Sequence, residues 1–243
     1  MSERPIPAVS DRPLHEEEHG AAVRRMFDGI APTYDVLNRT LSVGLDVRWR
    51  RRAIRALEGA PPGAALDLCA GTMDLTALLE GSPSVERVVA ADFSEEMLRR
   101  GRPKAPRAEV VVADAMALPF EAGEFSAVIC GFGIRNVADP LRVAREVRRV
   151  LGKGGVFVTL DSFQPSRGLP RLFHQAYTRL LFPMIGGVVS GHREAYAYFA
   201  DSVGSFLTRP AYEALLGDAG FGRTRAEDLA FGAASIVRAE VST

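Results

Sequence analysis

Short apolar runs alternate with segments of helical spacing along residues 64–161 of this 243-residue chain. Apolar runs bounded by turn residues are typical of buried strands, whereas apolar positions at i, i+3 and i+4 are typical of one helix face. Repeated strand–helix–strand order predicts an α/β fold with a mostly parallel sheet and helices on both faces. Five strands are expected, at residues 64–68, 85–92, 108–113, 125–130 and 156–161. Ser94 and Asp139-Pro140 are expected to cap the helices after the second and fourth strands, and the glycines of residues 152–155 are expected to form a turn before the fifth.

Helical patterns also precede this region. Residues 23–45 mix apolar and aromatic positions with Gly and Pro, which predicts short helices rather than one long helix. Residues 46–57 form the next predicted helix, and most of its arginines lie opposite the apolar side. Helices that precede the first strand of such a sheet can cover a ligand crevice, so residues 21–60 are interpreted as an N-terminal cover.

The pattern after residue 161 predicts further helices and two last strands. Residues 166–190 are rich in aromatic and aliphatic side chains, and helices are expected at 193–207 and 210–219. Residues 166–207 are interpreted as a second helical cover, over the substrate, although a helix that only packs on the sheet would look similar. The final two strands, at 221–229 and 231–240, are expected to pair as a hairpin.

The length of the chain fits one domain, which we assign to residues 21–243. Residues 1–20 combine prolines with a cluster of acids and are expected to be a mobile tail. The tail contains His15 and His19 in an H-E-x-x-H pattern. That zinc signature needs a buried helix and a third ligand, so coincidence is the better interpretation and no metal is expected.

A glycine turn follows the first strand. Asp67 lies near the carboxyl end of that strand, and Gly71 allows the backbone to approach a ligand closely. The three-glycine pattern for a pyrophosphate is not met, which disfavours NAD, FAD and nucleoside triphosphates. A nucleoside ligand without phosphates fits better, and a plain strand-to-helix turn is the alternative.

Two carboxylates at strand ends extend this interpretation, because ligands of open α/β sheets bind outside the carboxyl ends of the strands. Asp92 ends the second strand and can accept both hydroxyls of a ribose, or it can simply cap the next helix. Asp114 follows the third strand, where its carboxylate can accept a hydrogen bond from an adenine amino group.

Composition narrows the partners. The formal net charge is zero, so no overall field draws the protein to nucleic acid or to an anionic membrane. The five arginines within residues 48–55 are read as a solvated helix face, with phosphate binding as the less frequent alternative. Cys69 and Cys130 indicate reduced thiols, and no membrane span or signal peptide is recognised, so a cytoplasmic protein is expected.

Several motifs, in order, resemble those of class I S-adenosylmethionine-dependent methyltransferases. They are Leu66 to Thr72, the terminal Asp92, Asp114-Ala115 with Leu118-Pro119-Phe120, and Arg149-Val150-Leu151 before Gly154-Gly155. Two narrower stretches, Phe27 to Asn38 and Gly131 to Val137, resemble the C-methyltransferases of ubiquinone and menaquinone biosynthesis, the UbiE/MenG type. The resemblance runs from about Val23 to the C-terminus.

That family implies a Rossmann-like seven-stranded sheet, S-adenosylmethionine as cofactor and no metal. It also implies methylation of a ring carbon of a polyprenylated hydroquinone, a lipophilic substrate. By resemblance, the cofactor residues are Asp67, Gly71, Thr72, Asp92, Asp114, Ala115 and Gly131. The catalytic residues are Arg135, Asn136 and Tyr34, and the substrate residues are Phe27, His174, Tyr177 and His192.

The chain departs from the family pattern at three places. Met73 replaces a glycine in the turn, Gly131 replaces a serine, and residues 161–165 reorder the family segment Glu-Phe-Ser-Lys-Pro. The exchange at Met73 is tolerable if its backbone is helical. These departures concern the contacts around the methionine part of the cofactor and the identity of the substrate.

The expected reaction needs a phenolate, because a ring carbon is a poor nucleophile until a neighbouring hydroxyl loses its proton. Arg135 would stabilise that oxyanion, while Asn136 and Tyr34 orient it. A bound water that relays the proton is the favoured base, and His174 or His192 is the alternative.

The substrate favoured here is demethylmenaquinol. The ubiquinone-precursor benzoquinol, another small aromatic or RNA, and a non-catalytic cofactor-binding partner are the alternatives. Peripheral membrane contact and a homodimer stay open from the sequence.

Overall fold

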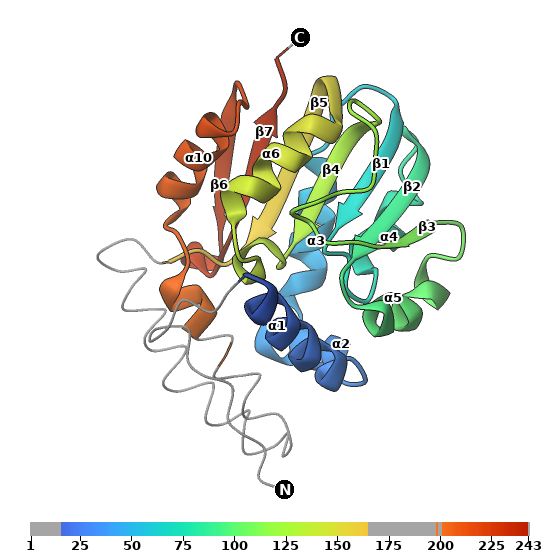
Figure 1. The fold of residues 1–243 in the computed structure, drawn as a ribbon, viewed down its shortest axis with the longest axis vertical. Coiled ribbons are helices and arrows are strands. Elements are labelled where there is room, and N and C mark those ends of the chain that lie inside the picture. Colours follow the sequence, from blue (N-terminus) through green and yellow to red (C-terminus); the bar gives the residue numbers. More distant parts are fainter. Residues whose placement is uncertain (1–15, 165–197, 199–200, 243) are drawn as a thin grey trace, which may run out of the picture.

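The computed structural model describes residues 16–164, 198 and 201–242 (Figure 1). Helix α1 (Glu16–Ile30) begins inside the segment predicted as a tail, so the tail boundary at residue 20 is too late. The remainder of the predicted tail lies outside the described residues.

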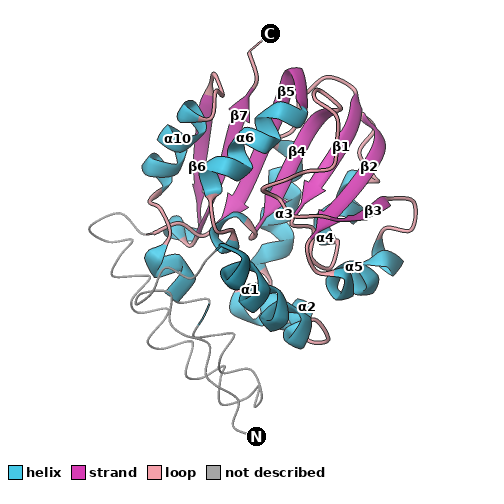
Figure 2. Ribbon diagram, viewed as in Figure 1, coloured by secondary structure: helices cyan, strands magenta, loops and turns pink. Residues whose placement is uncertain are grey.

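Seven strands form one sheet in the order β3-β2-β1-β4-β5-β7-β6 (Figure 2). Strands β1 to β5 pair in parallel, and β7 runs antiparallel to both β5 and β6, as expected for the final hairpin. The strands are β1 (Gly63–Leu68), β2 (Val85–Asp92), β3 (Glu109–Val112), β4 (Phe125–Gly131), β5 (Leu151–Asp161), β6 (Thr224–Leu229) and β7 (Ala234–Glu240).

Helices cover both faces of the sheet, and the alternation of side chains along each strand creates two cores. Leu66 and Leu68 of β1 pack in one core with α6 (Pro140–Val150) and α10 (Arg209–Asp218). Ala65, the residue before Leu66, packs in the other core with α3 (Leu45–Arg55), α4 (Asp74–Leu79) and α5 (Glu95–Gly101). The polar Asp67 falls on this second face, under α4.

Two helix starts confirm the capping predictions. Ser94 is the N-cap of α5, and its hydroxyl accepts a hydrogen bond from the Met97 amide at 3.1 Å. Asp139 is the N-cap of α6, and its Oδ1 accepts from the amides of Leu141 and Arg142, with Pro140 in the first turn. Both helices therefore start where the sequence places them.

Strand β5 begins at Leu151, five residues before the predicted start, which is a correction. The glycines of residues 152–155 were expected to form a turn that precedes the strand. Instead the pairing with β4 shifts between Phe125 and Ala127, and Gly154 adopts a φ of +70° inside the strand. The extra residues form an irregularity in the ladder, which glycine permits.

The N-terminal helices lie at the carboxyl edge of the parallel strands (Figure 1). Helix α1 is followed by α2 (Tyr34–Leu41) and α3, which confirms short helices over residues 23–45. Three short 3-10 helices complete the described elements: η1 (Arg102–Lys104), η2 (Ile134–Asn136) and η4 (Ala230–Gly232). Of the predicted helix 193–207, residues 198 and 201–207 are described. Residues 198 and 201–205 are helical, whereas residues 206 and 207 are not, so the predicted end at 207 is two residues too late.

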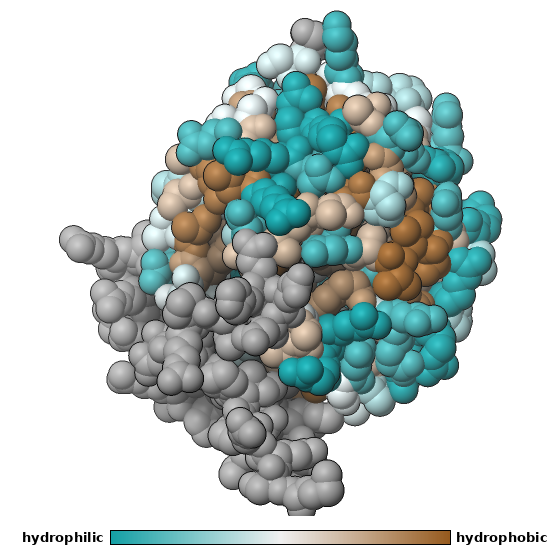
Figure 3. Space-filling view, in the orientation of Figure 1, coloured by the Kyte–Doolittle hydropathy of each residue, from teal (hydrophilic) through white to brown (hydrophobic). Residues whose placement is uncertain are grey.

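The edge strand β3 has four residues, and Val112 at its end is 51% exposed. Figure 3 shows an apolar patch in this region beside a mostly hydrophilic surface. A short edge strand offers few unpaired backbone groups to another chain. Within the part of the chain that the structure describes, no helix is long and apolar enough to cross a membrane.

Candidate active site

A cavity of about 520 Å³ opens at the carboxyl edge of the sheet. It is lined by the ends of β1, β2 and β4, by the loop after β3, and by α1 and α2. The strand order reverses between β1 and β4, which is where open α/β sheets bind ligands. Its volume lies in the range of small-molecule sites.

The turn of residues 69–73, named here the cofactor turn, forms one wall of the cavity. Gly71 has a φ of +54°, and a Cβ added there would lie 3.8 Å from both Met97 Cε and Tyr34 Cε1. Cys69, Met73 and, across the cavity, Phe132 are non-glycine residues with φ of 55°, 62° and 60°. Such backbone strain clusters at binding sites, where the surrounding structure enforces it.

Met73 therefore does not meet the condition of a helical backbone under which its exchange for glycine was interpreted as tolerable. Its φ and ψ are 62° and 29°, so it caps α4 in the left-handed conformation that glycine adopts most easily. The side chain is fully buried, and Gly101 of α5 makes room for it. Burial of a methionine side chain contributes about 1.5–3 kcal/mol, which offsets a left-handed cost of about 1–2 kcal/mol.

Asp92 lies in the cavity wall as a buried carboxylate. Its Oδ2 accepts from the Gly71 amide and its Oδ1 from the Ser94 amide, each at 2.8 Å. Burial raises the pKa of Asp92 to about 6, although both hydrogen bonds lower it. A carboxylate offers about four acceptor positions, so two hydroxyls of a ligand can still be accepted.

Asp114 and Ala115 also line the cavity, on the side of β3. Asp114 Oδ1 accepts from the Met116 amide at 2.8 Å, which fixes the carboxylate at the rim. With Asp92 they bring acceptor oxygens to one end of a pocket whose walls include Phe93 and Met97. This arrangement suits a nucleoside, because ribose and adenine present donors around apolar rings.

Two predicted cofactor residues do not line the cavity. The Thr72 hydroxyl donates to Asp35 Oδ1 at 2.6 Å, and Asp67 accepts from the Thr76 hydroxyl at 2.6 Å. Burial raises the pKa of Asp67 to about 7, and its Oδ1 has no hydrogen-bond partner among the described residues. Direct contact of Thr72 or Asp67 with a cofactor stays a prediction.

Gly131 lines the cavity at the end of β4. A Cβ added to Gly131 would lie 2.5 Å from Leu75 Cδ1, inside the sum of the van der Waals radii. The family's serine therefore does not fit here unless Leu75 moves. The exchange of serine for glycine follows from the packing of α4 against β4.

Arg135 lies behind the cavity wall rather than in it. Its guanidinium donates to Asp161 Oδ1 at 2.5 Å and to the Phe132 carbonyl at 3.1 Å. Burial lowers the pKa of Arg135, but the charge and hydrogen bond of Asp161, together with Tyr34 and Tyr198, raise it above its ordinary value, so the guanidinium stays protonated. The sequence signal for Asp161 was an acid at the end of a strand, the same signal that identified Asp92.

Asn136 does line the cavity, and two contacts orient its amide. Its Nδ2 donates to the Phe132 carbonyl at 3.1 Å, and its Oδ1 accepts from the Tyr198 hydroxyl at 3.2 Å. Burial raises the pKa of Tyr198 to about 12, so this hydroxyl stays a donor. The sequence predictions did not include Tyr198, whose position 62 residues along the chain gave no pairing signal.

Tyr34 and Phe27 form the wall on the side of the N-terminal helices. Their rings meet edge to face with centroids 6.0 Å apart, and Phe27 meets Phe93 in the same way at 6.5 Å. Burial raises the pKa of Tyr34 above its ordinary value, although a hydrogen bond with Asn38 lowers it. The predicted substrate residues His174, Tyr177 and His192 lie outside the described residues.

The cavity fits S-adenosylmethionine at its nucleoside end. Asp92 would hold the ribose, Asp114 the adenine amino group, and Gly71 gives close access to the backbone. In the described ranges 16–164, 198 and 201–242, no three His, Cys, Asp or Glu side chains cluster as a metal site.

The fold matches solved methyltransferases. A Thermotoga maritima structure described as a SAM-dependent methyltransferase, possible histamine N-methyltransferase, has a TM-score of 0.65 at 18% identity over 89% of this chain and 98% of that one. Haemonchus contortus phosphoethanolamine N-methyltransferase 2, solved with S-adenosyl-L-methionine, has a TM-score of 0.58 at 12% identity over 80% of this chain and 52% of that one. At these identities the match shows the fold alone, and it confirms the predicted class I fold.

Relatives found by sequence share more identical residues with this chain than these solved structures do. A Thermus thermophilus protein named demethylmenaquinone methyltransferase is 46% identical over 217 residues, covering 87% of this chain and 97% of its own. A Geobacter sulfurreducens protein named ubiquinone/menaquinone biosynthesis C-methyltransferase UbiE is 38% identical over 230 residues, covering 92% and 90%. The model of the ubiE/COQ5 methyltransferase family matches residues 14–240. The predicted resemblance is confirmed: the chain is an S-adenosylmethionine-dependent methyltransferase that belongs to the ubiE/COQ5 methyltransferase family.

Proposed function

We propose that this chain transfers a methyl group from S-adenosylmethionine to a ring carbon of demethylmenaquinol. The observation that carries the proposal is the 46% identity, over nearly all of the relative, to a protein named demethylmenaquinone methyltransferase. The geometry supports it, because one cavity is lined by the carboxylate of Asp92 and also by Asn136, Tyr34 and Phe27. A nucleoside and an aromatic ring can therefore share one enclosed space.

Bound at Asp92, S-adenosylmethionine supplies an electrophilic methyl group. The residues around the acceptor must make the ring carbon nucleophilic, which requires a phenolate. Asn136 uses one of its two amide hydrogens on the Phe132 carbonyl, so the other can donate to the substrate oxygen. A positioned donor at a developing oxyanion lowers the barrier because it needs no reorganisation during the reaction.

Arg135 does not line the cavity, so it acts on that oxyanion at a distance through its positive charge. It also donates to the Phe132 carbonyl, which accepts from Asn136 as well. Asp161 offsets part of this charge, and it also fixes the guanidinium against the Phe132 carbonyl. Arginine remains protonated, so it is not a base by itself. A water molecule at the wall of the cavity is our proposed proton relay. Apolar walls and the ring of Phe27 exclude bulk water and orient the acceptor.

We further propose that the protein contacts a membrane surface, because the proposed substrate is lipophilic. Val36 of α2 is 60% exposed and Val43, just after α2, is 73% exposed. These two exposed valines would insert into the apolar part of a bilayer. Flotation of the protein with vesicles, compared with a Val36→Ser/Val43→Ser variant, tests this contact, and equal flotation of both would contradict it.

The first experiment is a methyl-transfer assay with radiolabelled S-adenosylmethionine and reduced demethylmenaquinone. The ubiquinone-precursor benzoquinol, RNA and a sample without acceptor serve as the comparison arms. We expect labelled product with the naphthoquinol. Product only with the benzoquinol or only with RNA would replace the proposed substrate, and cofactor binding without any product would favour a non-catalytic partner.

A further inference from the structure

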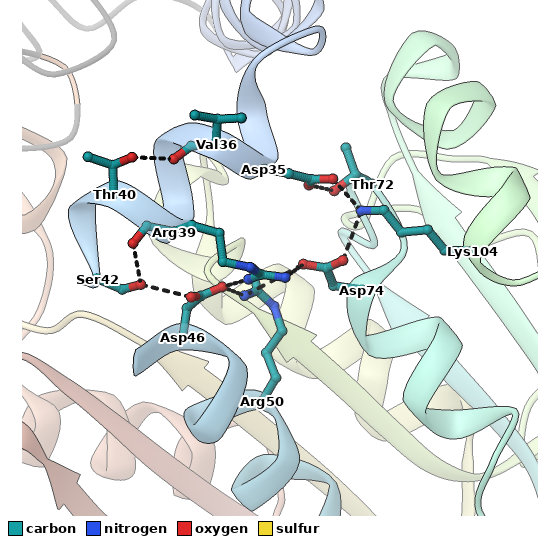
Figure 4. Close-up of polar contacts among 10 residues, drawn as sticks. All are labelled: Asp35, Val36, Arg39, Thr40, Ser42, Asp46, Arg50, Thr72, Asp74 and Lys104. Carbon is teal, nitrogen blue, oxygen red and sulfur yellow. Dashed lines mark hydrogen bonds and ion pairs between the residues drawn. The ribbon is translucent and has the colours of Figure 1, made fainter. Parts of the chain in front are cut away.

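Six charged side chains form an alternating chain of ion pairs beside the cofactor turn (Figure 4). Asp35 pairs with Lys104, and Lys104 pairs with Asp74. Asp74 and Asp46 then each pair with both Arg39 and Arg50. Lys104 Nζ lies 2.6 Å from Asp35 Oδ2 and 2.8 Å from Asp74 Oδ1. The six residues come from α2, η1, α4 and α3, so the chain joins the N-terminal cover to the sheet domain.

The inner part of this ion-pair chain is buried and structural. Asp46 is 2% exposed and contacts both Arg39 and Arg50, and the Arg50 side chain is 7% exposed. Asp74 Oδ2 lies 3.7 Å from Arg50 NH1. Removing one partner of a buried pair costs about 3–5 kcal/mol, so these residues anchor α3 against α4.

The outer part is different, because Asp35 and Lys104 are 41% and 29% exposed. Exposed pairs contribute about 0–1 kcal/mol, so stability alone gives little reason for this contact. The second oxygen of Asp35 accepts from the buried Thr72 hydroxyl at 2.6 Å. Asp35 therefore joins α2 directly to the cofactor turn.

The neighbour of Asp35 is Tyr34, whose ring lies in the cavity. Tyr34 Cε1 lies 3.8 Å from the Cβ position that a side chain at Gly71 would occupy. Helix α2 has eight residues, and helices of this length are not stable without tertiary contacts. The position of the Tyr34 ring therefore depends on the contacts that hold the first turn of α2.

We infer that Asp35 is a positioning residue, which holds Tyr34 over the cofactor turn through Thr72 and Lys104 and so couples cofactor binding to closure of α2 over the acceptor. Cofactor contacts that order residues 71–72 would strengthen the bond from Thr72 to Asp35. The ring of Tyr34 would then be fixed before the acceptor binds. The part of this inference that concerns the acceptor rests on the proposed function. The part that concerns cofactor affinity does not.

The cofactor part is tested by calorimetry with S-adenosylmethionine alone, on Asp35→Ala, Thr72→Val and the double variant. We expect each single variant to bind about fivefold more weakly and the double variant to be no weaker than the worse single one, because both remove one coupling. Glu227→Gln is the matched control. Glu227 is 44% exposed and ties Arg52 of α3 to β6 away from the cavity, so its affinity should be unchanged.

The acceptor part is tested by kcat and KM for reduced demethylmenaquinone. Asp35→Ala should lower kcat/KM about tenfold, mainly through KM, with little change in Tm. In a protein that already carries Tyr34→Ala, adding Asp35→Ala should cause no further loss of kcat/KM, because Asp35 acts through the ring of Tyr34. If the losses of kcat/KM in the two single variants add in the double variant, the inference is overturned. Additive losses would mean that Asp35 acts independently of Tyr34, for example through stability alone.

A second variant guards against a folding defect. Lys104→Met removes the other partner of Asp35 and should weaken cofactor binding in the same direction, by about twofold to fivefold. If the wild-type protein methylates no quinol, the proposed substrate fails, and the calorimetric arm alone decides the inference. Unchanged affinity in both Asp35→Ala and Lys104→Met would then overturn it.

Discussion

The two sides of the cavity are built in different ways. On the cofactor side, the carboxylate of Asp92 accepts hydrogen bonds from the backbone amides of Gly71 and Ser94, which follow the ends of neighbouring strands. On the acceptor side, Asn136 meets Tyr198, and Arg135 meets Asp161, from segments far apart in the chain. The cofactor side thus follows from local geometry, whereas the acceptor side depends on tertiary packing and can be altered by changes at a distance.

The largest expected effect is on the acceptor side. Arg135→Ala should lower methyl transfer by about a thousandfold or more while cofactor affinity is kept, since the positive charge is lost and so is the hydrogen bond of Arg135 to the Phe132 carbonyl, which also accepts from Asn136. It also leaves Asp161 buried without its partner, at a cost of about 3–5 kcal/mol in the free energy of unfolding. Turnover assays with calorimetry check both parts.

A matched control separates chemistry from folding in this variant. Adding Asp161→Asn to Arg135→Ala removes the buried charge, so much of the stability should return. Methyl transfer should stay low. Full activity in either variant would exclude the proposed role of Arg135.

The next effect is on the cofactor side. Asp92→Asn should raise the Kd for S-adenosylmethionine about a hundredfold, because hydrogen bonds to a charged group contribute about 1.5–3 kcal/mol each. At saturating cofactor, kcat should change little. Unchanged affinity in calorimetry would show that the ribose is held elsewhere.

A third change tests how rigid the cofactor turn is. A Cβ on Gly101 would lie 2.6 Å from the Thr72 carbonyl carbon and 2.6 Å from Met73 Cγ. Gly101→Ala should therefore lower the free energy of unfolding by about 1–3 kcal/mol, the usual range for overpacking. Gly217→Ala, where nothing lies within 4 Å of the added Cβ, is the control in denaturant unfolding.

The smallest expected effect concerns pH. The pKa of Asp67 is raised to about 7, so the folded protein holds a proton that the unfolded chain releases above pH 4. Its contribution to stability is therefore present at low pH and falls as the pH rises from about 4 to about 7. Asp67→Asn should flatten the stability profile in that window. An unchanged slope in unfolding experiments from pH 4 to 7 would contradict this.

The contrast between local geometry and tertiary packing also explains which features could be predicted from the sequence. Strand β2 was predicted at its observed bounds, and the caps Ser94 and Asp139 were placed correctly, because each depends on neighbouring residues. The bond between Asp35 and Thr72 joins positions 37 residues apart, and periodicity carries no information about such a contact. The start of β5 was missed because the glycines that usually end a strand here form an irregularity within it.

The site residues divide in the same way. Asp92, Asp114, Ala115, Gly71 and Gly131 reach the cavity because strand ends of a parallel sheet meet at one edge. Whether Thr72 and Arg135 face the cavity or another side chain depends on their partners, Asp35 and Asp161. The sequence pattern marks Asp161 as an acid at a strand end, but it does not pair Asp161 with Arg135 or Asp35 with Thr72. A resemblance to a family can transfer a residue's identity, but not its orientation.

Met73 and Gly101 have an evolutionary consequence. A left-handed methionine in the turn is accommodated because position 101 carries no side chain, so neither position can change freely on its own. Glycine at position 73 would relieve the left-handed backbone but would lose the buried methionine side chain, and a side chain at position 101 would overpack the turn. The two positions are therefore coupled, and a matched change at both is expected to be tolerated better than a change at either one alone.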